Sequence, residues 1–148
     1  MRGSITRLSA AVTVILGLAG CDLLYHERAV YAIEGATLMD GNALPPIAPA
    51  VVVVEDGKIT ALGAAAEVVI PRRAQRIDGR GKFVFPMSVN QPLKAGGPAD
   101  LILCDVNPAR EPDYRKYIFG RMDNGRWWSA AELPARKGTR PKAGGRLY

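Results

Sequence analysis

The sequence predicts an all-β fold, a small β-sandwich or open barrel, for residues 29–130. Short segments rich in β-branched and aromatic residues follow one another, separated by Gly, Pro, Asp and Asn. Two separators, Asp56-Gly57 and Asn124-Gly125, are typical of two-residue type I′ hairpin turns. The expected strands span residues 29–38, 50–55, 58–63, 67–70, 75–78, 82–85, 101–106, 117–123 and 126–128.

Individual residues refine this prediction. The four valines at 51–54 predict a strand buried on both faces, and Gly35 predicts a bulge or bend in the strand before it. The proline-rich residues 45–49 predict a loop, because proline cannot donate to a central ladder. The three alanines at 64–66 are compatible with a helical turn, which Pro71 keeps short.

The first 20 residues predict a signal helix for export. Arg2 and Arg7 precede an apolar run at 8–18, which is shorter than the roughly 20 residues that a membrane-spanning helix needs. The residues LAGC at 18–21 resemble the lipobox of bacterial lipoproteins, in which the cysteine becomes the acylated N-terminus. The alternative is an ordinary cleaved signal that leaves this cysteine as a free thiol.

The lipobox interpretation makes Cys21 the lipidation site and the lipid bilayer a partner. Asp22 resembles the sorting residue that retains some lipoproteins in the inner membrane. Residues 21–28 would then be a tether, and the chain would lie on the periplasmic, extracytoplasmic side of the bacterial cell membrane.

Charge is concentrated at the C-terminal end. The formal net charge is +6, of which Arg2 and Arg7 supply two units, so the chain from Cys21 onward carries +4. Five basic residues follow Glu132, the last acidic residue, and we expect residues 131–148 to form a basic, disordered tail. An alternative is that this tail lies on anionic lipid. Nucleic acid is not an expected partner, because no aromatic residues alternate with the charge.

Few side chains are suited to catalysis or metal binding. The only histidine, His26, falls in the tether, and Cys104 lies in the apolar run 101–104, where cysteine is usually a core residue. A catalytic zinc site needs about three protein ligands. The remaining candidate metal ligands are three aspartates at strand ends, Asp78, Asp100 and Asp105, although such aspartates more commonly cap turns. The remaining candidate nucleophile is Ser88. The composition therefore predicts no catalytic residue, no metal site and no cofactor.

One pair of residues is a candidate contact site. Strand alternation is expected to direct Trp127 into the core and Trp128 outward, next to Arg126. An exposed tryptophan beside an arginine is typical of residues that contact a partner.

Motifs in the first half of the fold resemble a known family. They are GATLMDG at 35–41, VVVEDGKITALG at 52–63 and RIDGRGKFVFP at 76–86. Their order and spacing resemble the opening of metal-dependent amidohydrolases of the imidazolonepropionase and dihydroorotase type. GGPADLIL at 96–103 and MDNGRW at 122–127 resemble the end of the same enzymes. The resemblance implies a composite β-sandwich formed by both ends, which in the family stands beside a TIM-like barrel.

The chain departs from the family after Pro86. There the enzymes continue with G-L/F-I-D-x-H-x-H, which holds the first metal ligands, whereas here residues 87–91 (MSVNQ) lead to the closing segment. No catalytic or metal-binding residue of the family therefore maps onto this sequence.

Three hypotheses for function follow. The leading one is a lipid-anchored, non-catalytic sandwich, with a possible protein partner on the face that the barrel normally covers. The second is a hydrolase of non-peptide carbon–nitrogen bonds whose barrel another chain supplies. The third is a surface binding module that uses Trp128 and the basic tail.

Overall fold

The computed structural model describes residues 29–42 and 44–133. The predicted signal and tether (1–28), with Cys21, Asp22 and His26, lie outside the described residues, as does the tail from 134 onward. Among the described residues no helix is long and apolar enough to span a bilayer.

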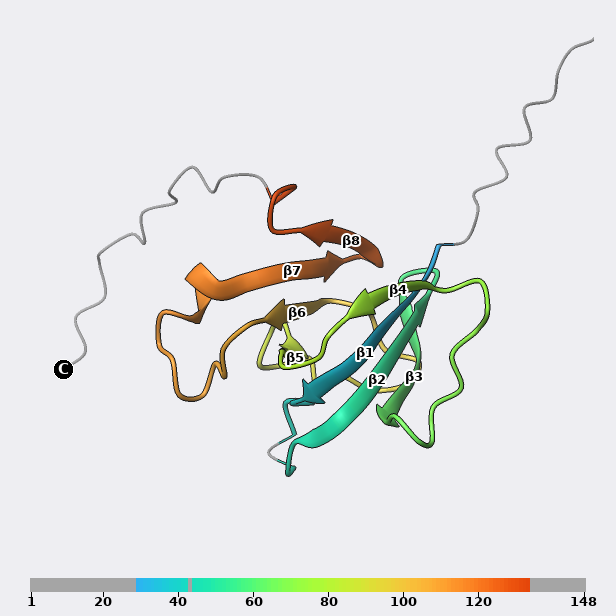
Figure 1. Ribbon diagram of the computed structural model, residues 1–148, viewed down its shortest axis with the longest axis horizontal. Coiled ribbons are helices and arrows are strands. Elements are labelled where there is room, and N and C mark those ends of the chain that lie inside the picture. The colour runs from blue at the N-terminus through green and yellow to red at the C-terminus, as the bar shows by residue number, and fades with distance from the viewer. Residues whose placement is uncertain (1–28, 43, 134–148) are drawn as a thin grey trace, which may run out of the picture.

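All eight strands belong to one mixed sheet that curls over on itself, so the all-β prediction is confirmed (Figure 1). The sheet order is β3-β2-β1-β5-β6-β7-β8, and β4 pairs with β1 in parallel. The elements are β1 (Val30–Leu38), β2 (Ile47–Glu55), β3 (Lys58–Ala64), β4 (Gln75–Asp78), β5 (Phe83–Pro86), β6 (Leu101–Cys104), a 3-10 helix η1 (Tyr114–Tyr117), β7 (Ile118–Asp123) and β8 (Arg126–Ser129).

The main core lies between the two halves of this sheet. Its fully buried side chains come from β1 to β3 on one side and from β6 and β7 on the other, for example Ile33, Val52, Ile59, Leu101 and Met122. Full burial of one such side chain contributes about 1.5–3 kcal/mol. Because distant parts of the sequence share the core, neither half is expected to bury its apolar face alone.

The outer edge of β3 is paired with residues 96–99, which lead into β6. The Ile59 N–H donates to the Gly97 carbonyl at 2.9 Å, and the Gly96 N–H donates to the Ile59 carbonyl at 2.7 Å. The Ala99 N–H donates to the Gly57 carbonyl at 2.9 Å. This edge is therefore covered, which places the architecture between a sandwich and an open barrel.

The prediction of a strand at 67–70 is wrong. A turn in which the Glu67 N–H donates to the Ala64 carbonyl at 2.9 Å redirects the chain after β3. The following segment, 65–74, is irregular and covers the second face of β2. A second apolar cluster forms there from Val30, Val51 and Val53 with Ala61, Ala65, Val68, Ile70 and Ala74. The four valines of β2 are therefore buried on both faces, as predicted.

The predicted loop at 45–49 is also partly wrong, because β2 begins at Ile47. The β2–β3 ladder starts only at Ala50, and beyond its end the Ala65 N–H donates to the Pro49 carbonyl at 2.9 Å. Pro49 is tolerated at this end of the ladder because no ladder donor is missing there. The strand expected at 101–106 ends earlier, at Cys104.

The turn and bulge predictions are confirmed. Gly35 has φ +75° and lies at a shift of register between β1 and β2. Both residues of each hairpin turn have positive φ, with Gly57 at +76° and Gly125 at +75°. The two hairpin tips touch: a Cβ on Gly125 would lie 2.1 Å from the Cα of Gly57.

Candidate functional site

The predicted contact residues Arg126 and Trp128 lie together on β8. The guanidinium carbon of Arg126 stands 4.0 Å from the centre of the Trp128 ring, and the indole is half-buried. Trp127 instead packs against the main core, over Gly120. Because Arg126 already covers the indole, a ligand on this ring would have to share it with the arginine.

The three aspartates considered as metal ligands each have a separate partner. Arg80 donates to Asp78 at 2.9 and 2.7 Å, and Lys82 donates to Asp105 at 2.6 Å. The Asn124 backbone N–H donates to Asp100 at 2.9 Å. Within the described residues no three His, Cys, Asp or Glu side chains converge. This part of the chain therefore does not fit the divalent metal of the amidohydrolases.

The two candidate nucleophiles are also far from catalytic arrangements. Cys104 is buried, its Sγ donates to the carbonyls of Tyr117 at 3.2 Å and Tyr114 at 3.4 Å, and burial raises the pKa of its thiol. A buried thiol with a raised pKa is a poor nucleophile. Ser88 lies in the β5–β6 connection, where its Oγ accepts from the Asn90 N–H at 3.4 Å.

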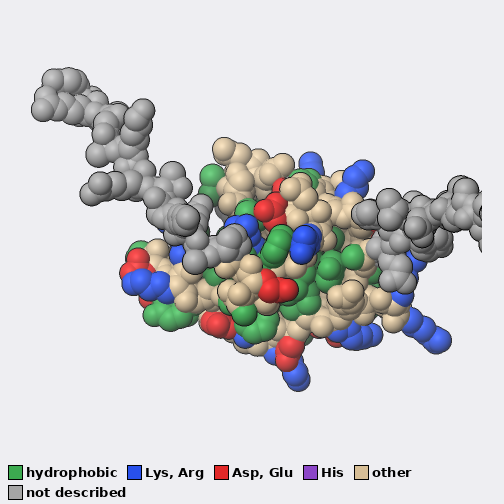
Figure 2. Space-filling view, turned by 90° about the horizontal axis from the view of Figure 1, so that it is seen from above, with side chains coloured by type: hydrophobic (Ala, Val, Ile, Leu, Met, Phe, Trp, Pro, Cys, Tyr) green, Lys and Arg blue, Asp and Glu red, His purple; other side chains and the backbone are tan. Residues whose placement is uncertain are grey.

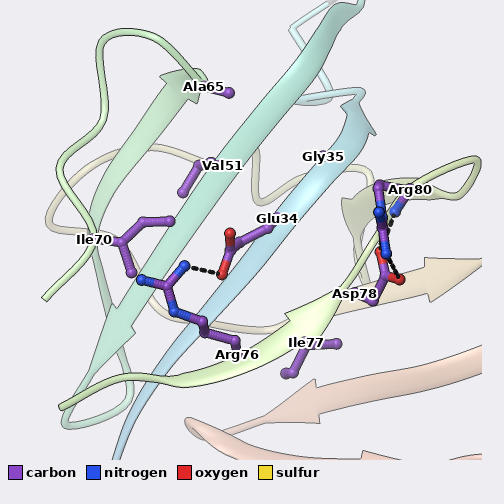
Figure 3. Close-up of a pocket in the computed structure, with 9 residues that line it drawn as sticks. All are labelled: Glu34, Gly35, Val51, Ala65, Ile70, Arg76, Ile77, Asp78 and Arg80. Atoms are coloured by element: carbon purple, nitrogen blue, oxygen red, sulfur yellow. Dashed lines mark hydrogen bonds and ion pairs between the residues drawn. The ribbon is translucent and has the colours of Figure 1, made fainter. Parts of the chain in front are cut away.

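A groove on the second face of the sheet is a concave site formed entirely by described residues. Its volume is about 500 Å³, and it lies over β1, β2 and β4 beside the 65–70 segment (Figure 3). Val51, Ala65 and Ile70 form one wall, and charged side chains from β1 and β4 form the other. The groove exists because the chain after β3 crosses this face without joining the sheet.

The charged wall consists of two ion pairs. The Arg76 Nη1 donates to the Glu34 Oε1 at 2.8 Å, and both side chains are partly exposed. Arg80 binds Asp78 through Nε and Nη2 and also donates its backbone N–H to the Asp78 Oδ1 at 3.0 Å. These bonds from Arg80 hold the pKa of the Asp78 carboxyl well below its usual range. The Asp78 carboxylate, with a weaker contribution from Glu34, raises the pKa of Arg80.

This arrangement is suited to binding rather than to reaction. Arginines remain protonated at any ordinary pH and do not act as general bases. The groove was not predicted from the sequence, although its signal was present. In R-I-D-G-R at 76–80, strand alternation places Arg76 and Asp78 on the face opposite to Ile77, which packs toward the main core.

Comparisons with known proteins find only local likeness. No protein-family model matches this chain, and no curated protein matches it. Among solved structures, molinate hydrolase is 36% identical over 40% of this chain and 13% of its own, with a TM-score of 0.37. A putative prolidase from Bifidobacterium longum is 32% identical over 39% of this chain and 15% of its own, with a TM-score of 0.37. Phenylurea hydrolase B is 29% identical over 39% of this chain and 13% of its own, with a TM-score of 0.36.

The chain thus spans about an eighth to a seventh of the length of these structures. A TM-score below 0.5 describes a partial likeness and establishes neither overall fold nor activity. The amidohydrolase resemblance accordingly depends on the motifs in residues 35–86 and 96–127.

Proposed function

We propose that this protein is a lipid-anchored, non-catalytic β-sandwich of the amidohydrolase type, which binds rather than transforms its partners. One observation carries the proposal: β5 pairs directly with β6. Four residue pairs join them, from Phe83 and Cys104 to Pro86 and Leu101. In the family that the motifs resemble, the residues of a whole barrel lie between these two segments in the sequence. Here residues 87–100 connect them, and the two halves share one core.

The chemistry of the described side chains supports the same proposal. Each aspartate at a strand end is held by a nearby donor, and the Cys104 thiol is buried. The groove offers charge and apolar surface, and its two carboxylates, Glu34 and Asp78, are each paired with an arginine. These features suit recognition of a ligand or a protein.

Anchoring is the second element of the proposal and derives from the LAGC pattern that ends at Cys21. β1 begins at Val30, nine residues later. A chain of that length reaches at most about 30 Å, so an acylated cysteine would hold the sandwich close to the bilayer.

The experiment that tests catalysis uses protein purified from membranes in detergent. Its zinc content is measured by elemental analysis, and its turnover is measured on an amide, a hydantoin and a lactam, with and without added zinc. We expect no stoichiometric zinc and no turnover. Turnover by the purified single chain would overturn the proposal.

The anchor is tested by membrane fractionation of a Cys21→Ser variant. We expect this protein in the soluble fraction, whereas the matched variant Cys104→Ala, which removes the other cysteine, stays with the membrane. Membrane retention of Cys21→Ser would refute lipid anchoring.

An exposed apolar edge favours a second candidate, a hydrolase completed by a barrel on another chain. Val89, in the β5–β6 connection, is 88% exposed, and Leu44, in the β1–β2 connection, is 65% exposed. The two connections are adjacent, because the Leu93 N–H donates to the Asp40 carbonyl at 2.8 Å. Apolar side chains at this junction suit a protein interface.

The discriminating experiment is purification of the anchored chain from its own membranes. If a barrel-containing protein co-purifies with zinc-dependent turnover, and Val89→Asp abolishes both, the second candidate is correct and the non-catalytic one is wrong. Val69→Asp is the matched control, because Val69 is 86% exposed but lies in the segment beside the groove. If the purified chain shows no turnover and no barrel-containing protein accompanies it, the leading proposal is supported.

A further inference from the structure

We propose that the groove over β1, β2 and β4 binds a free aliphatic α-amino acid. This inference is independent of the proposed function, because it depends only on the geometry of the second sheet face. The volume, about 500 Å³, lies within the range of small-molecule pockets, roughly 300–1,000 Å³. A ligand of this class has three parts, and the groove offers a counterpart for each.

The Arg76–Glu34 pair matches the two charged groups of the ligand. Their single hydrogen bond, 2.8 Å long, uses one nitrogen of the arginine and one oxygen of the glutamate. A guanidinium has five N–H donors and a carboxylate two oxygens, so each partner keeps bonding capacity. The side chains are 58% and 31% exposed, respectively, so a ligand can approach both. A ligand carboxylate beside Arg76 and a ligand ammonium beside Glu34 would place the dipole of the ligand antiparallel to the dipole of the ion pair.

The neighbouring pair has a different role. Asp78 binds Arg80 through both carboxylate oxygens and also accepts the backbone N–H of Arg80. This closed arrangement leaves the pair fixed at one end of the groove (Figure 3). Gly35 lies on β1 beside Glu34, and a Cβ added there would lie 2.7 Å from the Arg80 Cγ, so the missing side chain lets Arg80 pack against β1.

Charge balance selects a zwitterion over a simple ion. The polar wall contains two arginines and two carboxylates and is formally neutral. A monocarboxylate or a monoamine would leave one uncompensated charge in the groove, whereas an amino acid leaves none.

The opposite wall selects an aliphatic side chain. It is formed by Val51, Ala65 and Ile70, which belong to the second apolar cluster. Figure 3 shows these side chains in the part of the groove that also holds the Glu34–Arg76 pair. Figure 2 shows that apolar and charged side chains intermingle on the visible surface of the sandwich.

The test is isothermal titration of the full chain in detergent micelles with L-leucine. Three probes each lack one part: 4-methylpentanoate lacks the ammonium, 3-methylbutylamine lacks the carboxylate, and glycine lacks the side chain. We expect saturable binding of leucine, about tenfold or more tighter than that of each probe, because each probe lacks one of the three groups that the groove would contact. Binding of 4-methylpentanoate as tight as that of leucine would overturn the zwitterion inference.

Variants connect the binding to this groove. Arg76→Gln is expected to weaken leucine binding by about tenfold, and Ile70→Ser to remove the preference for leucine over glycine. Arg110→Gln is the matched control, because Arg110 is exposed and lies outside the groove. Circular dichroism checks the fold of each variant. If Arg76→Gln is unfolded, Glu34→Gln is used in its place. Absence of leucine binding, or binding that neither Arg76→Gln nor Glu34→Gln weakens, would refute the proposal.

Discussion

The contact between the two hairpin tips provides the sharpest test of the composite sandwich. Gly125 of the β7–β8 turn has φ +75°, and its added Cβ would lie 2.1 Å from the Cα and 2.5 Å from the N of Gly57 in the β2–β3 turn. Both obstructing atoms are backbone, so no side chain can rotate away. The contact joins the segment that resembles the start of the enzymes to the segment that resembles their end.

A Gly125→Ala substitution therefore has two costs. A left-handed conformation costs an L-residue roughly 1–2 kcal/mol. Forcing a methyl group into packed atoms typically costs a further 1–3 kcal/mol, so the free energy of unfolding should fall by about 2–5 kcal/mol. Since a domain of this size loses about 4–8 °C in Tm for each kcal/mol, the melting temperature should fall by at least about 8 °C.

Gly81→Ala is the matched control. Gly81 has a similar φ of +73°, but no atom lies within 4 Å of its added Cβ. This variant has the conformational cost without the steric one, and it should lose about 1–2 kcal/mol. The assay is urea or thermal unfolding followed by circular dichroism. Equal losses in the two variants would refute the contact between the hairpin tips.

Three further predictions concern single side chains. Gly120→Ala should cost about 1–3 kcal/mol and shift the tryptophan emission, because the added Cβ would lie 2.3 Å from the Trp127 ring; unchanged emission would contradict the packing of the indole on this glycine. Asp78 has a lowered pKa in the folded state because of Arg80, so its contribution to stability is present above the ordinary aspartate pKa and is lost as the pH falls below it. Asp78→Asn should therefore flatten the decline of Tm between about pH 4 and pH 2, and an identical decline in both proteins would contradict the ion pair. The Cys104 thiol should react with a disulfide reagent only after unfolding, because it is buried and has a raised pKa; rapid reaction of the native protein would contradict this burial.

Local sequence patterns predicted much of this fold because they act over a few residues. Asp56-Gly57 and Asn124-Gly125 produce positive φ wherever they occur between strands, and Gly35 permits the bulge in β1. The four valines required burial on both faces, although the sequence did not indicate which segment covers the second one.

The strand predicted at 67–70 shows the limit of such patterns. Val68 and Ile70 have high β-propensity, yet they pack over β2 instead of pairing in the sheet. Their burial, rather than a ladder of hydrogen bonds, decides their conformation, and propensity does not distinguish the two. The groove forms because the segment after β3 crosses this face without joining the sheet, so it was not predicted either.

The sequence by itself determined the strand-rich character, the turns and the shortage of side chains able to hold a metal, because all three depend on residue type and close neighbours. Only the tertiary structure decided that β5 and β6 pair, that the two hairpin tips meet, and that Glu34 and Arg76 face an apolar wall. Each of these joins residues far apart in the chain, and long-range pairing is fixed by the packing of a shared core rather than by any local signal.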